Sequence, residues 1–219
     1  MLRSVLVTGA TGYLGRTLVE LTQRRGHQVT AFVRPGSQGR VPPGVIQAIG
    51  DPFAIDDVGR ALAHGDTLVH LIGTPRPNPR KAKQFREVDL RSVQVAASAA
   101  SRAGVAHIVY VSVAHPAPVM QAYIAARREA EHALVATGIP ATILRPWYVL
   151  GPGHWWPYAL VPLYSLFERV PSTRATAQRL GLVTHKQMIA TLIRVIEEGP
   201  SGVRVIEVPE IRQALPLDH

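Results

Sequence analysis

The sequence VLVTGATGYLG occupies residues 5–15 and decides the fold. Its first three residues are apolar, as in a buried strand, and they lead directly into a turn with a glycine at every third position. Beyond the turn, Leu14, Leu18 and Leu21 recur at the spacing of one helix face. The stretch therefore predicts a buried strand, a tight loop and the N-terminus of a helix, in that order.

The three glycines of this loop have separate expected roles. Gly9 permits a sharp turn, Gly12 lets a pyrophosphate approach the backbone closely, and Gly15 lets the helix pack tightly on the strand. A helix start also offers unpaired N–H groups and a partial positive charge to an anion. A glycine-rich turn without a ligand is the alternative. We expect the loop to bind the diphosphate of a dinucleotide through Gly9, Ala10, Thr11, Gly12, Tyr13, Leu14 and Gly15.

The composition is that of an ordinary globular protein. The chain has 219 residues, of which 47% are hydrophobic, and it has no cysteine, which excludes disulfides and thiolate zinc sites. We expect a single domain over residues 1–219, with a cofactor-binding core at 1–150 and a small substrate or lid portion at 151–219. The histidines are dispersed along the chain, so no metal site is predicted.

The charge and hydropathy of the chain indicate in which compartment the protein acts and which kinds of molecule it binds. The formal net charge of +9 comes almost entirely from scattered arginines. This pattern indicates a solvated basic surface that attracts an anionic cofactor or substrate, and no nucleic-acid partner is expected. The first strand begins near Ser4, which leaves no room for a signal peptide, and no apolar run approaches the ~20 residues of a membrane span. We expect a cytoplasmic protein that acts on a small molecule, with a homodimer as one possible assembly.

The end of the second predicted strand bears on the choice of cofactor. A strand is expected over residues 28–33, and Arg34 follows it about twenty residues beyond the glycine loop. An NAD-binding domain usually has an acid here for the ribose 2′-hydroxyl, whereas a guanidinium can pair with a 2′-phosphate through two hydrogen bonds. NADP(H) is therefore favoured over NAD(H), unless Arg34 is only a solvated loop residue.

Three motifs give the chain a family resemblance. The Gly-x-x-Gly-x-x-Gly spacing with the leading Thr8 resembles the cofactor loop of extended and atypical short-chain dehydrogenase/reductases. The segment from Tyr123 to Arg127 resembles their Tyr-x-x-x-Lys helix, and TILRP at residues 142–146 is similar to the end of their sixth strand. The resemblance is to NmrA-like, NAD(P)-binding members. It implies an α/β fold with a doubly wound parallel (Rossmann) sheet in the order 3-2-1-4-5-6.

The resemblance also implies cofactor contacts beyond the glycine loop. In these families an acid after the third strand hydrogen-bonds the adenine, the end of the fourth strand lines the ribose, and residues after the sixth strand flank the nicotinamide. The residues at those positions are Asp51 for the adenine, Leu71, Ile72 and Gly73 for the ribose, and Pro146 and Trp147 for the nicotinamide. For the first of these, a turn-forming aspartate before proline is the alternative.

The implied catalytic residues are Ser112, Tyr123 and Arg127. In the resembling family the tyrosine moves a proton to or from the carbonyl or alcohol oxygen, the lysine lowers the tyrosine pKa, and the serine holds the substrate oxygen. Here Arg127 replaces the lysine; it keeps the charge, but its planar fork does not automatically preserve the ribose contact. The alternatives are a Tyr123 ring packed against the sheet and an Arg127 on a solvated helix face.

These residues and the resemblance suggest three functions, which belong to different classes of protein. The first is an NADP(H)-binding oxidoreductase that transfers hydride to a small carbonyl-like or quinone-like substrate, with Tyr123 as proton donor, Ser112 orienting and Arg127 tuning. The second is a catalytically silent NAD(P)(H)-binding regulator or assembly protein, which the replacement of the lysine favours. A nucleotide-sugar epimerase is a third possibility, and the short C-terminal portion argues against it.

Other predicted elements surround this site. The proline-rich segment 74–79 follows the fourth strand, where an open α/β sheet binds its substrate. Helices are expected at 84–103 and 185–198, with a last strand at 203–208. Arg145 is expected to be a buried structural arginine paired with a carboxylate. An apolar pocket wall, a lid or a satellite core is predicted from the aromatic residues Trp147, Tyr148, Trp155, Trp156 and Tyr158.

Overall fold

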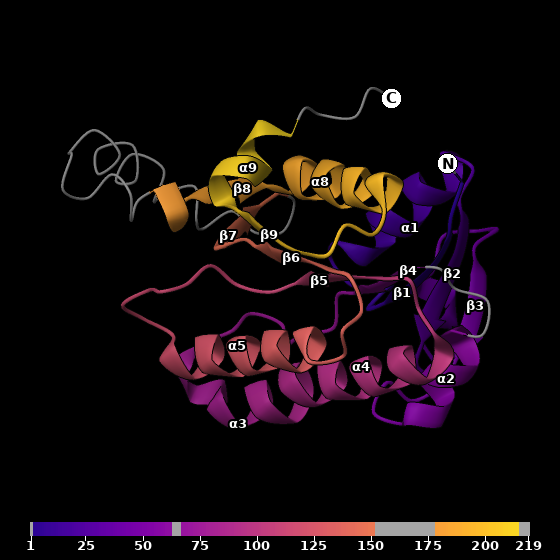
Figure 1. Cartoon of the computed structure of the whole chain (residues 1–219), viewed down its shortest axis with the longest axis horizontal. Helices are drawn as coiled ribbons and strands as arrows, with labels where there is room; N and C mark the ends of the chain where they lie inside the picture. The colour runs from indigo at the N-terminus through magenta and orange to yellow at the C-terminus, as the bar shows by residue number, and fades with distance from the viewer. Residues whose placement is uncertain (1, 63–66, 152–177, 215–219) are drawn as a thin grey trace.

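A parallel sheet of seven strands lies between two layers of helices in the computed structural model, which describes residues 2–62, 67–151 and 178–214 (Figure 1). The strand order is β3-β2-β1-β4-β5-β6-β9, and every neighbouring pair is parallel. The strands are β1 Ser4–Thr8, β2 Gln28–Val33, β3 Ile46–Ile49, β4 Thr67–His70, β5 His107–Val111, β6 Ala141–Arg145 and β9 Val203–Glu207. The order reverses between β1 and β4, and ligands of such sheets bind at that switch point.

Helices cover both faces of the sheet (Figure 1). One face carries α1 Gly15–Arg24, α8 His185–Glu198 and the short α9 Val208–Gln213. The other face carries α2 Ile55–Leu62, α3 Ala82–Gln84, α4 Arg91–Ala103 and α5 Gln121–Val135. Single 3-10 turns lie at Gln38–Arg40 and Pro79–Lys81, and a π-helical turn at Phe85–Leu90 joins α3 to α4. A separate parallel pair is formed by β7 Tyr148–Leu150 and β8 Leu182–Thr184.

Alternate residues of β1 enter two separate cores. Val5 and Val7 belong to the apolar cluster that includes residues of α1 and α8, and Leu6 belongs to the cluster that includes residues of α2 and α4. Because both faces of the strand are buried, its sequence is apolar without the alternation of a half-exposed strand. The glycine loop that follows β1 therefore starts from a strand held on both sides.

The predicted strand order 3-2-1-4-5-6 is confirmed, and β9 extends it by one strand at the β6 edge. The helix predicted at 84–103 begins earlier, at residue 82, and contains the π-helical turn. The helix α8 matches its predicted bounds, whereas α9, β7 and β8 were not predicted, because segments of three to six residues are too short for a periodic pattern. Within 151–219, the range predicted as a small substrate or lid portion, α8 and β9 belong to the main three-layer body.

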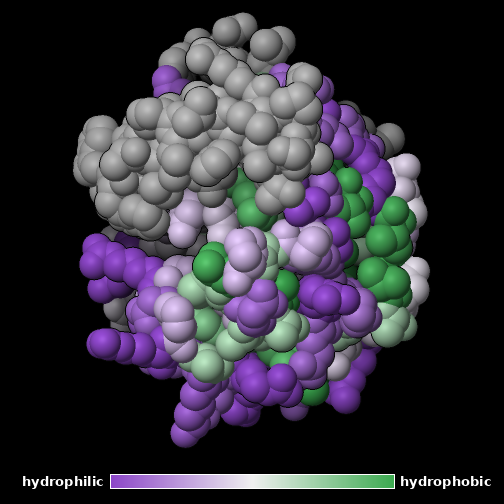
Figure 2. Space-filling model, turned by 90° about the vertical axis from the view of Figure 1, so that its left-hand side faces the viewer, coloured by the Kyte–Doolittle hydropathy of each residue, from purple (hydrophilic) through white to green (hydrophobic). Residues whose placement is uncertain are grey.

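The surface agrees with the arginine-rich composition. Hydrophilic and hydrophobic residues are interspersed on the side of the molecule that carries α3 and the loop between β5 and α5 (Figure 2). Among the helices in the described ranges, none is both long and apolar enough to cross a bilayer.

Candidate functional site

The glycine loop has a backbone that side chains would obstruct. Gly9 has a φ of +72°, and a Cβ there would lie 2.8 Å from the backbone carbon of Leu71. A Cβ on Gly15 would overlap the carbonyl oxygen of Gly9 and lie 2.7 Å from the Cα of Ala10. The N–H of Gly12 donates to the Gly9 carbonyl at 2.9 Å, which closes the turn. The sharp turn at Gly9 and the tight packing at Gly15 are thus both present.

Within the described part of the chain, no side chain caps the N-terminus of α1, although the Arg16 N–H donates to the Gly12 carbonyl at 3.2 Å. Leu14 occupies the N-cap position and offers no side-chain hydrogen bond, and the first turn contains no acidic residue. The orphan N–H groups and the positive end of the helix dipole are therefore available to an anion. Of the other loop residues, Ala10 is buried and Thr11 is half-buried, while Gly12 and Tyr13 are exposed. This bare backbone cradle fits the diphosphate of a dinucleotide.

The ends of β2 and β3 flank the position expected for the adenosine half. Arg34 is exposed, and its guanidinium has no hydrogen-bond or ion-pair partner within the described residues. The Asp51 carboxylate accepts from the N–H of Phe53 at 2.9 Å, and its own N–H donates to Asp57 at 2.8 Å. Asp51 therefore does form a local turn, the alternative to adenine binding, and its adenine contact stays a prediction.

The end of β4 lies directly beside the glycine loop. Thr8 of β1 is in register with His70 of β4, and the N–H of Leu71 donates to the carbonyl of Thr8 at 3.1 Å. Leu71, Ile72 and Gly73 are half-buried along this edge. The segment predicted to line the cofactor ribose is thus next to the segment predicted to hold the diphosphate.

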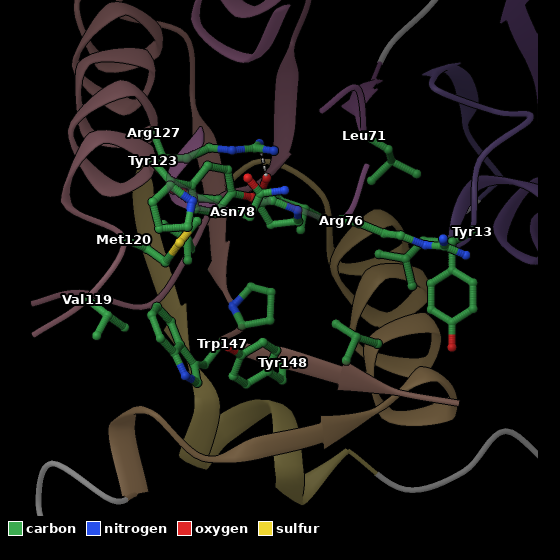
Figure 3. A pocket seen from close by; sticks show the side chains of 18 residues that line it. Tyr13, Leu71, Arg76, Asn78, Val119, Met120, Tyr123, Arg127, Trp147 and Tyr148 are labelled. Atoms are coloured by element: carbon green, nitrogen blue, oxygen red, sulfur yellow. Dashed lines mark hydrogen bonds between the residues drawn. The ribbon is translucent and has the colours of Figure 1, made fainter. Parts of the chain in front are cut away.

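A cavity of about 870 Å³ joins the loop to the catalytic candidates (Figure 3). Tyr13 and Leu14 line it from the glycine loop, and Tyr123 and Arg127 line it from α5. The rest of its described lining consists of Leu71, Arg76, Pro77, Asn78, Pro79, Val111, Ser112, Val113, Val119, Met120, Pro146, Trp147, Tyr148 and Val149. The structure therefore brings Ser112, Tyr123, Arg127, Pro146 and Trp147 to one cavity.

Arg127 is buried, with only 6% of its surface exposed, and both of its terminal nitrogens have partners. Its Nη2 lies 2.7 Å from the Asp89 carboxylate, and its Nη1 donates to the Val111 carbonyl at 3.0 Å and to the Tyr110 hydroxyl at 3.1 Å. A Cβ on Gly73 would overlap Nη2, so the glycine makes room for this guanidinium. The alternative of an Arg127 on a solvated helix face is wrong.

The aromatic ring of Tyr123 contacts the guanidinium of Arg127. The Arg127 Cζ lies 5.1 Å from the ring centroid of Tyr123, and the ring centroids of Phe85 and Tyr123 are 4.9 Å apart. Burial raises the pKa of the Tyr123 hydroxyl, and the positive charge of Arg127 only partly offsets that effect. The tyrosine is therefore a protonated phenol at neutral pH, stacked on a cation.

Ser112 is tied to a second buried charge network. Its hydroxyl donates to the Glu131 carboxylate, which also accepts from the Nε of Arg145 at 3.1 Å. The Arg145 guanidinium makes a second hydrogen bond to the same carboxylate and lies 3.7 Å from Glu207. Arg145 is the structural, carboxylate-paired arginine that was expected. Ser112 lines the cavity, but its hydroxyl hydrogen is directed away from it.

Sequence reasoning missed Asp89 and Glu131, the two buried carboxylates behind these networks. Glu131 had a signal, because it lies four residues after Arg127 and so shares its helix face. Asp89 had none, because it lies in the π-helical turn, where the helical spacing changes. Its other carboxylate oxygen accepts from the N–H and the hydroxyl of Thr74, which fixes the start of the loop after β4.

The histidines and aromatic residues add structure around the cavity. His70 is buried between the hydroxyls of Thr8 at 3.0 Å and Ser92 at 3.1 Å. Its burial, together with the nearby charge of Arg127, lowers the pKa of His70 to about 3, so the ring is neutral. No group of three His, Asp or Glu side chains suited to a metal occurs in the described part of the chain. Trp147 and Tyr148 stack edge to face with ring centroids 5.5 Å apart, and Trp155, Trp156 and Tyr158 of the predicted lid lie outside the described residues.

Comparison with known proteins adds family evidence. A family model described as NAD(P)H-binding matches residues 9–152. The chain is 27% identical over 216 residues to a ceramide reductase of Caulobacter vibrioides, an alignment that covers 95% of this chain and 65% of that protein. It is 31% identical over 114 residues to a 3-beta-hydroxysteroid dehydrogenase of Mycolicibacterium neoaurum, covering 49% of this chain and 31% of that protein. The chain thus spans less than two thirds of the length of either relative.

Solved structures share the fold at low sequence identity. The Bordetella bronchiseptica enzyme WbmH in complex with NAD+ superposes with a TM-score of 0.69 at 17% identity, covering 94% of this chain and 75% of that one. MoeE5 in complex with UDP-glucuronic acid and NAD superposes with a TM-score of 0.69 at 21% identity, covering 95% and 79%. At these identities the likeness establishes the fold alone.

Proposed function

Because the chain belongs to the NAD(P)H-binding family of atypical short-chain dehydrogenase/reductases, we propose that it is an NADP(H)-dependent oxidoreductase. Its substrate is a small carbonyl-like or quinone-like molecule. The observation that carries the proposal is the cavity of about 870 Å³, which Tyr13 and Leu14 of the glycine loop share with Tyr123. The similarity to a protein named as a ceramide reductase favours reduction over the epimerase alternative.

In this proposal the cofactor lies along the carboxyl edge of the sheet. The backbone of residues 9–15 holds the diphosphate, and Arg34 pairs with a 2′-phosphate. Residues 71–73 border the ribose, with Asp51 at the adenine, and Pro146 and Trp147 border the nicotinamide. The exposed guanidinium of Arg34, which has no hydrogen-bond or ion-pair partner among residues 2–62, 67–151 and 178–214, supports the preference for NADP(H).

The side chains of the cavity supply proton transfer and orientation. A reduced nicotinamide supplies the hydride when it is bound. Tyr123 donates its hydroxyl proton to the substrate oxygen, and its raised pKa keeps that proton in place until the oxygen gains negative charge. Arg127 holds the phenol through the face of its ring, while the two terminal nitrogens of the guanidinium pair with Asp89 and donate to Val111 and Tyr110. Because its hydrogen goes to Glu131, the Ser112 oxygen orients the substrate by accepting from a donor such as the hydroxyl of the alcohol form, and it does not donate to the carbonyl oxygen.

A second candidate function is a catalytically silent NAD(P)(H)-binding regulator. The observation that favours it is the pairing of Arg127 with Asp89, which neutralises the charge that would lower the pKa of a catalytic tyrosine. In that case the cofactor cradle is used for binding and sensing, and Tyr123 only packs between Phe85 and Arg127.

Absorbance at the reduced nicotinamide band separates the two functions. The oxidoreductase predicts NADPH consumption with a member of a carbonyl and quinone panel, and a loss of about 100-fold in turnover for Tyr123→Phe, the usual scale of general acid catalysis. Unchanged NADPH affinity in that variant shows that binding is intact. NADPH binding without turnover on any substrate of the panel favours the regulator instead.

The cofactor preference is tested by titrating NADPH and NADH into wild type and Arg34→Ala. Loss of a charge-assisted pair with a 2′-phosphate should weaken NADPH binding by roughly 10- to 100-fold and leave NADH unchanged. Arg40→Ala, in the same exposed loop region after β2, is the matched control. Equal affinities for both dinucleotides in all three proteins contradict the assignment of Arg34.

A further inference from the structure

The loop after β4 carries an arginine whose surroundings point to a ligand. Arg76 lies between two prolines of the segment 74–79, directly after the strand that meets β1 at the switch point of the sheet. It lines the cavity of about 870 Å³ together with Tyr13 and Leu14 of the glycine loop. Its guanidinium has no hydrogen-bond or ion-pair partner within the described residues.

The backbone at Arg76 is held in a costly conformation. Its φ is +48°, and among the described non-glycine residues only Met120, with a φ of +59°, is also left-handed. Both residues line this cavity. Such backbone persists only where the surrounding structure imposes it, and it gathers at ligand-binding sites.

The loop around Arg76 is anchored on both sides. Before it, the N–H and hydroxyl of Thr74 donate to the buried carboxylate of Asp89. After it, the ammonium group of Lys81 donates back to the Pro75 carbonyl at 2.6 Å, and the Asn78 side chain caps the turn that begins at Pro79. These bonds fix the position from which the Arg76 side chain starts.

No acidic side chain in the described lining of the cavity offsets the charge of Arg76. The described lining contains no aspartate or glutamate, and its other arginine, Arg127, is paired with Asp89. In Figure 3 the Arg76 side chain extends away from Tyr123 and toward Tyr13 of the glycine loop. An anion between Arg76 and that loop would meet a guanidinium on one side and the uncapped start of α1 on the other.

We propose that Arg76 is an anion-binding residue that closes over a phosphate-class group held at the glycine loop. This inference deepens the proposed function and rests on it for the identity of the anion. Two sources carry this chemistry, namely the diphosphate of the dinucleotide and a phosphate group of the substrate. The direction of the side chain, toward the glycine loop, favours the diphosphate.

Calorimetric titration of Arg76→Ala with inorganic pyrophosphate, ADP, adenosine and NADPH tests the proposal. We expect about tenfold or greater weakening for pyrophosphate, ADP and NADPH, and no change for adenosine, which lacks phosphate. Arg80→Ala is the matched control, because Arg80 is an exposed arginine directly after the segment 74–79 and does not line the cavity. It should stay within about twofold of wild type, as expected for a surface charge that is not in contact with the ligand.

A second variant tests whether weaker binding by Arg76→Ala comes from misfolding rather than from loss of the side chain. Arg76→Gly removes the same side chain and accommodates the left-handed backbone, so it should melt at or above the wild-type temperature while binding as weakly as Arg76→Ala. Arg76→Lys, which keeps the charge without the fork, should recover part of the affinity.

The results distinguish the two sources of the anion from each other. They also separate the anion site of Arg76 from the proposed oxidoreductase function. If NADPH affinity is unchanged in Arg76→Ala but KM rises about tenfold for phosphate-bearing substrates alone, the anion belongs to the substrate and the site stands. If neither pyrophosphate nor phosphate-bearing substrates respond more than they do in Arg80→Ala, the proposal is overturned. A wild-type protein that binds pyrophosphate through Arg76 but neither binds nor oxidises NADPH rejects the oxidoreductase and retains the anion site.

Discussion

The glycine loop and the Tyr123 region form two ends of one site, and they are built in opposite ways. The loop owes its shape to missing side chains, since a Cβ on Gly9 or Gly15 would strike neighbouring backbone. The Tyr123 region owes its shape to buried charges, with Arg127 paired to Asp89 and Arg145 paired to Glu131. Substitutions in the glycine loop should therefore destabilise the protein through steric overlap. Substitutions in the Tyr123 region should destabilise it by leaving a buried charge unpaired.

The largest effect is expected at the charged end. Asp89→Asn removes the counter-charge of a buried guanidinium, which typically costs about 3–5 kcal/mol of the free energy of unfolding. Urea denaturation measures the loss. Glu87→Gln is the matched control, because Glu87 pairs with Lys83 at 3.5 Å on the surface, where such pairs contribute about 0–1 kcal/mol. Equal stabilities of the two variants would remove the claim that buried charge shapes this end.

The second effect is expected at the glycine end. Gly15→Ala places a Cβ against the Gly9 carbonyl and the Ala10 backbone, so we expect up to about 3 kcal/mol of destabilisation and loss of dinucleotide affinity. Gly59→Ala is the control, because a Cβ there meets no atom within 4 Å and an alanine in α2 should stabilise the protein by up to about 1 kcal/mol. Thermal melts and NADPH titrations of both variants provide the measurements, and a Gly15→Ala protein that melts and binds like wild type would refute the steric argument.

These two ends also differ in how much the sequence predicted. The glycine loop could be predicted because its determinants, a buried strand, three glycines and a helix, lie within a few residues of one another. The bounds of α8 follow from the same kind of local pattern, whereas the strand order up to β6 was implied by the family resemblance. The partners of Arg127 could not be predicted, because Asp89 and Gly73 come from other elements and meet it only in the folded chain. The bond from Ser112 to Glu131 was missed for the same reason.

The smallest effect is expected at His70, which links the two ends. It contacts Thr8 at the start of the glycine loop, and burial followed by the charge of Arg127 lowers its pKa from 6.5 to about 3. The unfolded chain therefore binds a proton that the folded chain does not, so stability is full above pH 6.5 and falls as the pH is lowered toward 3. At pH 5 the loss from this residue is about 2 kcal/mol.

Urea denaturation of wild type and His70→Asn between pH 5 and pH 8 isolates that contribution. The variant should show a shallower loss of stability on acidification, although it is less stable throughout because the bonds to Thr8 and Ser92 are altered. A His70 ring that titrates near pH 6.5 in NMR spectra of the folded protein would contradict the coupling between the two ends.

The central claim is that the backbone of residues 9–15 binds the diphosphate of a nicotinamide dinucleotide. Titration of NADPH into isotope-labelled protein, followed through backbone amide shifts, tests it most directly. We expect saturable shifts that are largest at Gly12, Tyr13 and Gly15 and extend to Leu71 and Gly73. Amide shifts that leave residues 9–15 unmoved at saturating NADPH would contradict it.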